Sequence, residues 1–264
     1  MPITASAATV LHAQDYLESS RIYRLLLRDA GMVSVVARGV RRAGRTATSP
    51  PDLFATGVAQ VDLKPGRDLH ALRDFEATSP RLGLGRDLPR FLAAGALAEV
   101  ALRFVADEAS PSAYDAVVDG LDALAVVPAE QADGAALGAL WALVQALGFA
   151  PTLDRCASCG RPVADEPGDT LLFHHRSGGV LCAACAVEWV HPEAGRAVGG
   201  RRLPRPALAQ IGEWMAAGGE RGAPSALDTG ACRAHQRLLR EFLAEHLSER
   251  RPLRAYGAWE SGGV

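Results

Sequence analysis

This sequence of 264 residues lacks several signatures of membrane proteins and enzymes. Its first residues have neither the basic start nor the long apolar stretch of a signal peptide, and the longest apolar run, residues 135–151, contains Gln145 and is shorter than a membrane span. No Gly-x-x-x-x-Gly-Lys-Ser/Thr motif and no Gly-x-Ser-x-Gly motif occur. We therefore expect a cytoplasmic protein with neither a P-loop nor a serine-hydrolase elbow.

Lysine is nearly absent, because Lys64 is the only one and arginine supplies the remaining positive side-chain charge. The overall net charge is −2, but it is distributed unevenly. Residues 1–79 carry +2, residues 80–150 carry −5, residues 151–200 carry −2 and residues 201–264 carry +3. The composition is 48% hydrophobic and 22% charged, which is typical of a globular chain with a core.

Residues 1–79 have the alternating pattern of β-strands, interrupted by turn signals such as Asp29-Ala30-Gly31 and Lys64-Pro65-Gly66. The pattern predicts strands near residues 9–12, 21–28, 32–40, 58–64 and 69–78. Five short strands with no helices between them predict a small closed barrel or a sandwich.

The loop after the third strand is basic and rich in glycine. It contains Arg38, Arg41, Arg42 and Arg45. Such a loop can contact phosphates electrostatically and without regard to base sequence. The alternative is a solvated loop that only opposes aggregation, but on a five-stranded barrel we favour the nucleic-acid interpretation.

From residue 80 the apolar period changes to that of helices. Helices are expected from Asp87 to about residue 109, from Ser110-Pro111 onwards, and from Asp133 to Leu147, the last apolar on nearly all sides and therefore central. Two more are expected at residues 204–217 and from a Thr229 cap to Leu247, followed by a basic, glycine-rich tail. Residues 80–150 and 201–264 are thus predicted to form one helical domain in two parts.

Between these parts, residues 151–200 contain Cys156-Ala-Ser-Cys159-Gly160 and Cys182-Ala-Ala-Cys185. Two such turns facing each other supply four sulfurs in a tetrahedron, the geometry of a structural zinc site. Disulfides and a redox Cys-x-x-Cys are the alternatives, and both are disfavoured in a cytoplasmic chain with a duplicated pair. Short strands at residues 170–174 and 180–181 complete a predicted zinc ribbon, in which His174 and His175 are expected to be exposed rather than ligands.

A catalytic zinc site fits the sequence less well. Zinc deaminases need His-x-Glu before Pro-Cys-x-x-Cys, whereas His191-Pro192-Glu193 follows both cysteine pairs. Four cysteine ligands also leave no open coordination position. The fifth cysteine, Cys232, is expected to be a buried apolar filler.

The predicted last helix carries a row of arginines on one face: Arg233, Arg237 and Arg240. This row could contact phosphate or an acidic peptide. A solvated face partly paired with Glu241 and Glu245 is the alternative.

One segment is especially specific: Gly148-Phe149-Ala150-Pro151-Thr152-Leu153-Asp154-Arg155-Cys156-Ala157-Ser158-Cys159-Gly160. Other notable segments are Val10-Leu11, Tyr16-x-Glu18, Gly31, Val36-Ala37-Arg38-Gly39 and Arg251-Pro252-Leu253-Arg254. Together these segments resemble the RecO family of bacterial recombination mediators, and the resemblance spans essentially the whole chain.

The resemblance implies an α+β multidomain protein: an N-terminal five-stranded OB-fold barrel, then a helical domain interrupted by a four-cysteine zinc ribbon. It implies a DNA repair and recombination mediator without enzymatic turnover, which binds single- and double-stranded DNA and anneals complementary strands. It also implies that the protein works with RecR, and in some bacteria RecF, to help RecA replace single-strand-binding protein (SSB), whose acidic C-terminal tail the family binds.

On an OB-fold, DNA binding needs a basic groove and exposed aromatic rings. We expect the four loop arginines and Lys64 to supply charge. Tyr23, His70 and Phe75 are candidates for stacking on bases, although a core position is favoured for each of these aromatic side chains. A barrel with a net charge of only +2 predicts weak, salt-dependent binding that needs the C-terminal arginines or RecR.

Overall fold

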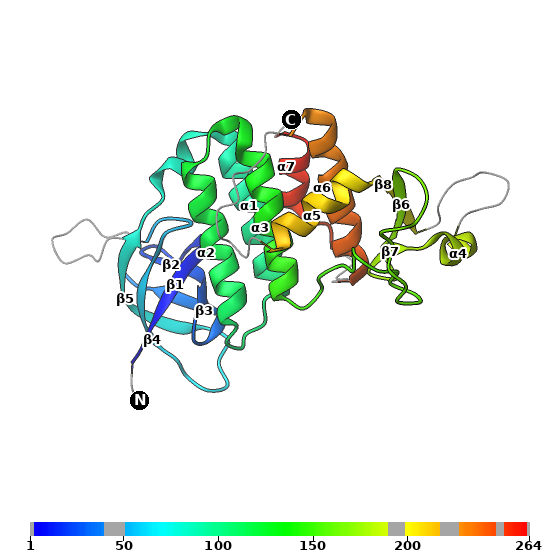
Figure 1. Ribbon diagram of the computed structural model, residues 1–264. Coiled ribbons are helices and arrows are strands. Elements are labelled where there is room, and N and C mark those ends of the chain that lie inside the picture. The colour runs from blue at the N-terminus through cyan, green and yellow to red at the C-terminus, as the bar shows by residue number, and fades with distance from the viewer. Residues whose placement is uncertain (1–2, 40–50, 190–198, 217–226, 247–250, 263–264) are drawn as a thin grey trace.

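The computed structural model describes residues 3–39, 51–189, 199–216, 227–246 and 251–262. A β-barrel lies at one end, a layer of helices occupies the middle, and a small sheet with the cysteine pairs lies at the other end (Figure 1). None of the helices within these ranges is long and apolar enough to cross a membrane.

The barrel has five strands: β1 (Thr4–Tyr16), β2 (Ser20–Leu27), β3 (Gly31–Ala37), β4 (Thr56–Asp62) and β5 (His70–Ser79). Their order is β1-β2-β3-β5-β4, and β4 pairs back with β1 to close the barrel. Only β3 and β5 run parallel. The predicted five-stranded barrel of OB type is therefore confirmed, and Asp29-Ala30-Gly31 forms the expected turn between β2 and β3.

The barrel buries side chains on both sides of β2. Tyr23, Leu25 and Leu27 point into the barrel core, whereas Leu26 belongs to the core of the helical layer. Met32 of β3 belongs to the same core as Leu26, so the outer face of β2 and β3 packs on the helices. A strand buried on both faces explains the dense apolar sequence of β2.

Three helices follow the barrel: α1 (Leu88–Phe104), α2 (Pro111–Val126) and α3 (Ala132–Ala146). Asp87 caps α1 as predicted, since its carboxylate accepts the Arg90 backbone N–H at 3.1 Å. The helix ends at Phe104, earlier than expected. α3 is central, and its Trp141 is fully buried against Phe242.

The small sheet contains one strand that the sequence did not indicate. β6 (Thr170–His174) and β7 (Gly179–Leu181) form the expected hairpin, and β8 (Gly200–Pro204) pairs with the other edge of β6. β8 carries two arginines and a proline, so it has no apolar alternation of its own. Its strand conformation follows from pairing with β6.

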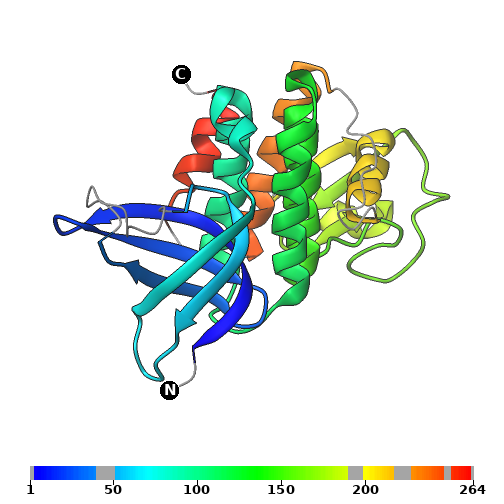
Figure 2. The same cartoon turned by 90° about the vertical axis from the view of Figure 1, so that its left-hand side faces the viewer.

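Helices α5 (Arg205–Ala216), α6 (Thr229–His246) and α7 (Arg254–Glu260) complete the fold. Asp228, rather than Thr229, caps α6 by accepting the Ala231 N–H at 2.8 Å. The predicted tail is wrong, because α7 packs against α1 (Figure 2) with Tyr256 and Trp259 buried. Glu99 of α1 accepts two backbone N–H groups at the start of α7, and Trp259 donates to Asp133.

Arg81 joins the barrel to the helices. Its side chain is almost fully buried and donates to the Phe54 carbonyl, the Thr56 hydroxyl and the Asp122 carboxylate at 2.7–2.8 Å. Both Arg81 (φ 45°) and Phe54 (φ 66°) have left-handed backbone conformations, which non-glycine residues adopt at a cost.

Candidate metal centre and nucleic-acid interface

The first cysteine pair lies on a tight turn. Cys156 donates its backbone N–H to the Arg161 carbonyl at 2.7 Å, and Gly160 donates to the Cys156 carbonyl at 2.8 Å. Gly160 has φ 74°, so a residue with a side chain would be strained there. The turn therefore presents Cys156 and Cys159 on the same side.

The second pair lies where β7 ends and the short helix α4 (Ala183–Ala186) begins. Cys182 immediately precedes α4, and Cys185 lies within it. The Ala157 N–H donates to the Val180 carbonyl at 2.8 Å, which holds the first turn against β7. Glu166 accepts the Ala183 N–H and fixes the start of α4.

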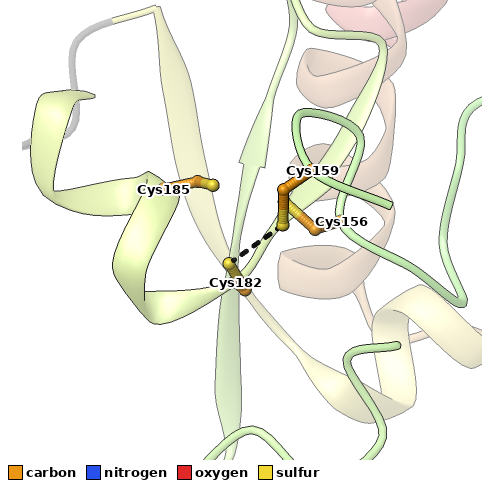
Figure 3. A group of neighbouring side chains, drawn as sticks. All are labelled: Cys156, Cys159, Cys182 and Cys185. Atoms are coloured by element: carbon orange, nitrogen blue, oxygen red, sulfur yellow. Dashed lines mark hydrogen bonds between the residues drawn. The ribbon is translucent and has the colours of Figure 1, made fainter. Parts of the chain in front are cut away.

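The four sulfurs converge, with all Sγ atoms within 4.8 Å of one another (Figure 3). Cys159 Sγ and Cys182 Sγ are 3.8 Å apart. Four sulfurs at about 2.3 Å from a tetrahedral ion lie about 3.8 Å from each other. All five cysteines of the chain are free thiols in the structure, so the geometry favours a metal site over the disulfide alternative.

The pKa values of two of these thiols shift in opposite directions. Burial opposes ionisation of Cys156, but hydrogen bonds from the backbone at Cys182, Cys159 and Ser158 outweigh it and lower its pKa to about 6. Hydrogen bonds with the Cys182 and Cys159 thiols raise the pKa of Cys185 to about 12. A dication at the centre would stabilise all four thiolates together.

His174 and His175 lie outside this sulfur cluster, but the expectation that they are exposed is wrong. Both are buried, because β6, which ends at His174, is the central strand of the small sheet and Glu241 of α6 lies against His175. His174 contacts the Ser177 hydroxyl at 2.7 Å, and His175 Nε2 contacts Glu241 at 3.1 Å. Burial lowers the pKa of each histidine.

The predicted nucleic-acid residues of the barrel are only partly within the described chain. Arg38 follows β3 and is exposed, whereas Arg41, Arg42 and Arg45 lie outside the described residues. Lys64 is half exposed, with its Nζ 3.9 Å from Asp62. His70 Nδ1 accepts the Lys64 backbone N–H at 3.1 Å, which ties the two predicted residues into one turn.

Two of the three candidate stackers, Tyr23 and Phe75, occupy the core position that the sequence favoured for them. Tyr23 has no exposed surface and Phe75 is 7% exposed, because both fill the barrel core. Burial also raises the pKa of the Tyr23 hydroxyl. Among the tyrosine and phenylalanine rings of the described barrel, only Tyr16 is exposed, at 41%, and the imidazole of His12 on β1 is exposed as well. The position of Tyr16 beside a turn was the sequence signal that could have identified it as an exposed ring.

The arginine row on α6 is divided. Arg233 and Arg237 are exposed and have no ion pair within the part of the chain that the structure describes. Arg240 instead pairs with Glu260 of α7 at 2.7 Å. The pairing with Glu241 that the alternative predicted is absent there, because Glu241 binds Arg201 and His175.

Comparisons with known proteins agree with this architecture. The family model "Recombination protein O N terminal" matches residues 1–81, and "Recombination protein O C terminal" matches residues 85–255. A protein named DNA repair protein RecO from Anaeromyxobacter sp. (strain K) is 34% identical over 250 residues, covering 94% of this chain and 92% of the relative. Its namesake from Nocardioides sp. is 35% identical over 184 residues, covering 68% of this chain and 73% of that protein. The match extends across the barrel, the helices and the cysteine centre, so the chain belongs to the recombination protein O (RecO) family.

Proposed function

We propose that this protein is a non-enzymatic mediator of DNA repair and recombination. It binds single- and double-stranded DNA, anneals complementary strands, and acts with RecR to load RecA onto single-stranded DNA covered by SSB. The observation that carries the proposal is the match of both family models, which together account for the barrel and the helical part with its cysteine centre. Relatives that align over most of this chain are named DNA repair proteins.

The barrel is the proposed DNA-binding part. OB-type barrels hold single strands on one face and in the loops at its edge. Arg38 is exposed at the start of the basic loop, so phosphates are attracted to this end of the barrel. Residues 1–79 carry a net charge of only +2, and weak binding that declines steeply with salt is expected.

The helical part is the proposed site for protein partners. Arg233 and Arg237 present positive charge suited to the acidic C-terminal tail of SSB or to DNA. RecR is a further proposed partner, as is RecF in some bacteria. RecA is proposed to benefit indirectly, without direct binding to this protein. The protein would act in the bacterial cytoplasm, at the nucleoid when bound to DNA.

The four cysteines are proposed to hold one zinc ion with a structural role. Sulfur ligands in this geometry suit zinc, and four of them leave no position for water or substrate. The bound ion would hold the turn after Pro151 against β7 and α4. The DNA-related activity would lie on the barrel.

The test of DNA binding is an annealing assay with complementary oligonucleotides at several salt concentrations. The variant is Arg41→Ala/Arg42→Ala, and the control is Arg155→Ala/Arg161→Ala, which removes two exposed charges from the cysteine module instead. The loop variant should anneal more slowly with a shallower salt dependence, and the control should anneal as the wild type does. Equal annealing by all three proteins would refute the role of the loop.

A second candidate function is a protein-interaction scaffold that touches DNA only through partners. The modest charge of the barrel favours it. Under this alternative, the protein would bind an SSB tail peptide or RecR and would leave free single-stranded DNA unbound at moderate salt. Titration of labelled DNA with and without RecR at two salt concentrations separates the two functions.

A further inference from the structure

The hairpin between β1 and β2 ends in two exposed apolar residues. Tyr16 is 41% exposed and Leu17 is 73% exposed, which are high values for a large aromatic and a large aliphatic side chain. Leu17 also has φ 54°, the left-handed region that glycine or asparagine adopts far more readily. Neither burial nor turn geometry explains a leucine there. Unfavourable backbone conformations that persist at exposed positions cluster at functional sites.

The hairpin projects beyond the barrel wall. Residues 4–9 of β1 pair with β4, whereas from His12 to Tyr16 the strand pairs only with β2. Figure 2 shows these two blue strands reaching to one side of the barrel. The tip is therefore accessible from several directions, and its side chains have no neighbouring strand to cover them.

The tip borders the surface that OB-type barrels use for oligonucleotides, between the β1–β2 and β4–β5 loops. One cross-strand row connects the two loops, because Gln14 pairs with Ile22, Ile22 with Val36, and Val36 with Ala71 near the start of β5. Arg21 pairs with Ala37, so the register brings Arg38 next to Ser20, which is itself the partner of Tyr16. The exposed ring at the end of β1 and the exposed Arg38 after β3 thus lie on the two sides of β2, near its first residue.

Charge decides which part of a nucleic acid the tip can contact. Glu18 is exposed at the tip, and Asp15 accepts a hydrogen bond from Arg21 at 2.9 Å. The tip therefore offers no net electrostatic attraction to phosphates. Positive charge is available near the tip at Arg38, which follows β3, and at Arg24 on β2. The Nε of Arg24 is buried and has no hydrogen-bond partner among the described residues. This arrangement favours bases at the tip and phosphates beside it, a division that a protein partner would not require.

We propose that the Tyr16–Leu17 tip stacks against unpaired bases of single-stranded DNA, while Arg38 and Arg24 contact the adjoining backbone. The inference rests on the proposed function, because it assumes that the barrel binds single strands. It replaces the buried Tyr23 and Phe75 as the stacking surface. Stacking on an aromatic ring accepts every base, which suits a protein that handles strands of any sequence.

The test measures binding of the full-length protein to a labelled oligothymidylate of about 16 nucleotides, the upper end of the length that one OB-fold covers. The variants are Tyr16→Ser and Leu17→Asn. Leu17→Asn should fold at least as stably as the wild type, because asparagine tolerates the left-handed conformation. The control is Val58→Thr, since Val58 is also 41% exposed but lies on β4 opposite Glu76.

A second oligonucleotide of equal length carries abasic sites and so keeps the phosphates without the bases. The wild type should bind the normal strand more tightly than the abasic one, and each tip variant should lose about tenfold affinity for the normal strand only. Val58→Thr should behave as the wild type.

Three results would refute this reasoning: the first two refute base stacking at the tip, and the third refutes the proposed DNA-binding function. If the wild type binds the normal strand and the tip variants bind it equally well, base stacking at the tip is wrong and the tip is left for a protein partner. If the variants lose affinity for both strands equally, the tip acts on phosphates or on folding, and base stacking is again wrong. If the wild type binds neither strand, the proposed DNA-binding function itself fails.

Discussion

Replacing Arg81 by alanine should uncouple the barrel from the helices. The guanidinium reaches from the end of β5 to the Phe54 carbonyl, the Thr56 hydroxyl and the Asp122 carboxylate, and only 1% of the Arg81 side chain is exposed. These partners belong to the segment before β4, to β4 itself and to α2. One side chain therefore connects the barrel with the helical layer.

Arg81 also donates a longer, fourth hydrogen bond to the Val118 carbonyl at 3.4 Å, and the contacts contribute unequally. The Phe54 carbonyl is buried, so loss of its charge-assisted hydrogen bond should cost about 1.5–3 kcal/mol. The Thr56 hydroxyl also donates to Thr9 and is not orphaned, and half-exposed Asp122 can return to water at a cost of no more than about 1 kcal/mol. The sum for Arg81→Ala is about 3 kcal/mol, which at this chain length lowers Tm by about 6–12 °C.

The left-handed backbone at Arg81 supplies a second, independent expectation. Alanine keeps the strain at φ 45°, whereas glycine removes it. Arg81→Gly should therefore be more stable than Arg81→Ala by roughly 1 kcal/mol, although both lose the same side-chain contacts. This order is the reverse of the usual one for alanine and glycine.

The assay is thermal unfolding combined with hydrogen exchange of barrel peptides. Exchange should accelerate in β1 and β4 before global unfolding, since local opening reports on the lost connection. Arg28→Ala is the control, because Arg28 also links the barrel to α2 through Asp115 at 2.9 Å but is exposed. If Arg81→Ala unfolds at the same temperature as Arg28→Ala, or if the alanine variant is more stable than the glycine variant, the reasoning is refuted.

Two further predictions concern the cysteine centre and a buried histidine. Purified protein should contain one zinc ion per chain by elemental analysis; Cys156→Ser should lose it and lower Tm, whereas Cys232→Ser, which alters a cysteine outside the cluster, should retain it. Metal-free wild-type protein would contradict the site. Burial lowers the pKa of His235, whose Nδ1 has no partner among the described residues. The unfolded chain then binds the proton more readily, so the free energy of unfolding should fall as pH drops below about 6.5. His235→Leu should weaken this dependence in denaturant titrations at several pH values, and an unchanged slope would contradict it.

Much of the fold could be predicted because its signals are local. The turn at Asp29-Ala30-Gly31, the Asp87 cap and the apolar α3 each depend on a few adjacent residues, and the structure has all three. β8 and α7 could not be predicted in this way. β8 is a strand because β6 offers it hydrogen bonds, and α7 is a helix whose first N–H groups are accepted by Glu99, far earlier in the chain.

The metal centre and the DNA surface differ in the same respect. Two close pairs of cysteines are enough to predict that the four sulfurs converge on one metal ion, because each turn already orients two sulfurs to the same side. An aromatic residue on a strand carries no such information, since the alternation that turns Tyr23 inwards and Tyr16 outwards depends on where the barrel closes. His174 and His175 were misjudged for the same reason, because His174 packs on Trp189 and His175 contacts Glu241 of α6, both from other parts of the chain.

The sequence alone determined the order of barrel, helices and cysteine module, since periodicity, turn residues and ligand spacing act over short distances. Only the tertiary structure decided which side chains reach the surface. It buried Tyr23 and Phe75, left Tyr16 and Leu17 exposed, and placed Arg81 between barrel and helices. Burial depends on contacts between segments far apart along the chain, and such contacts leave no pattern in any one segment.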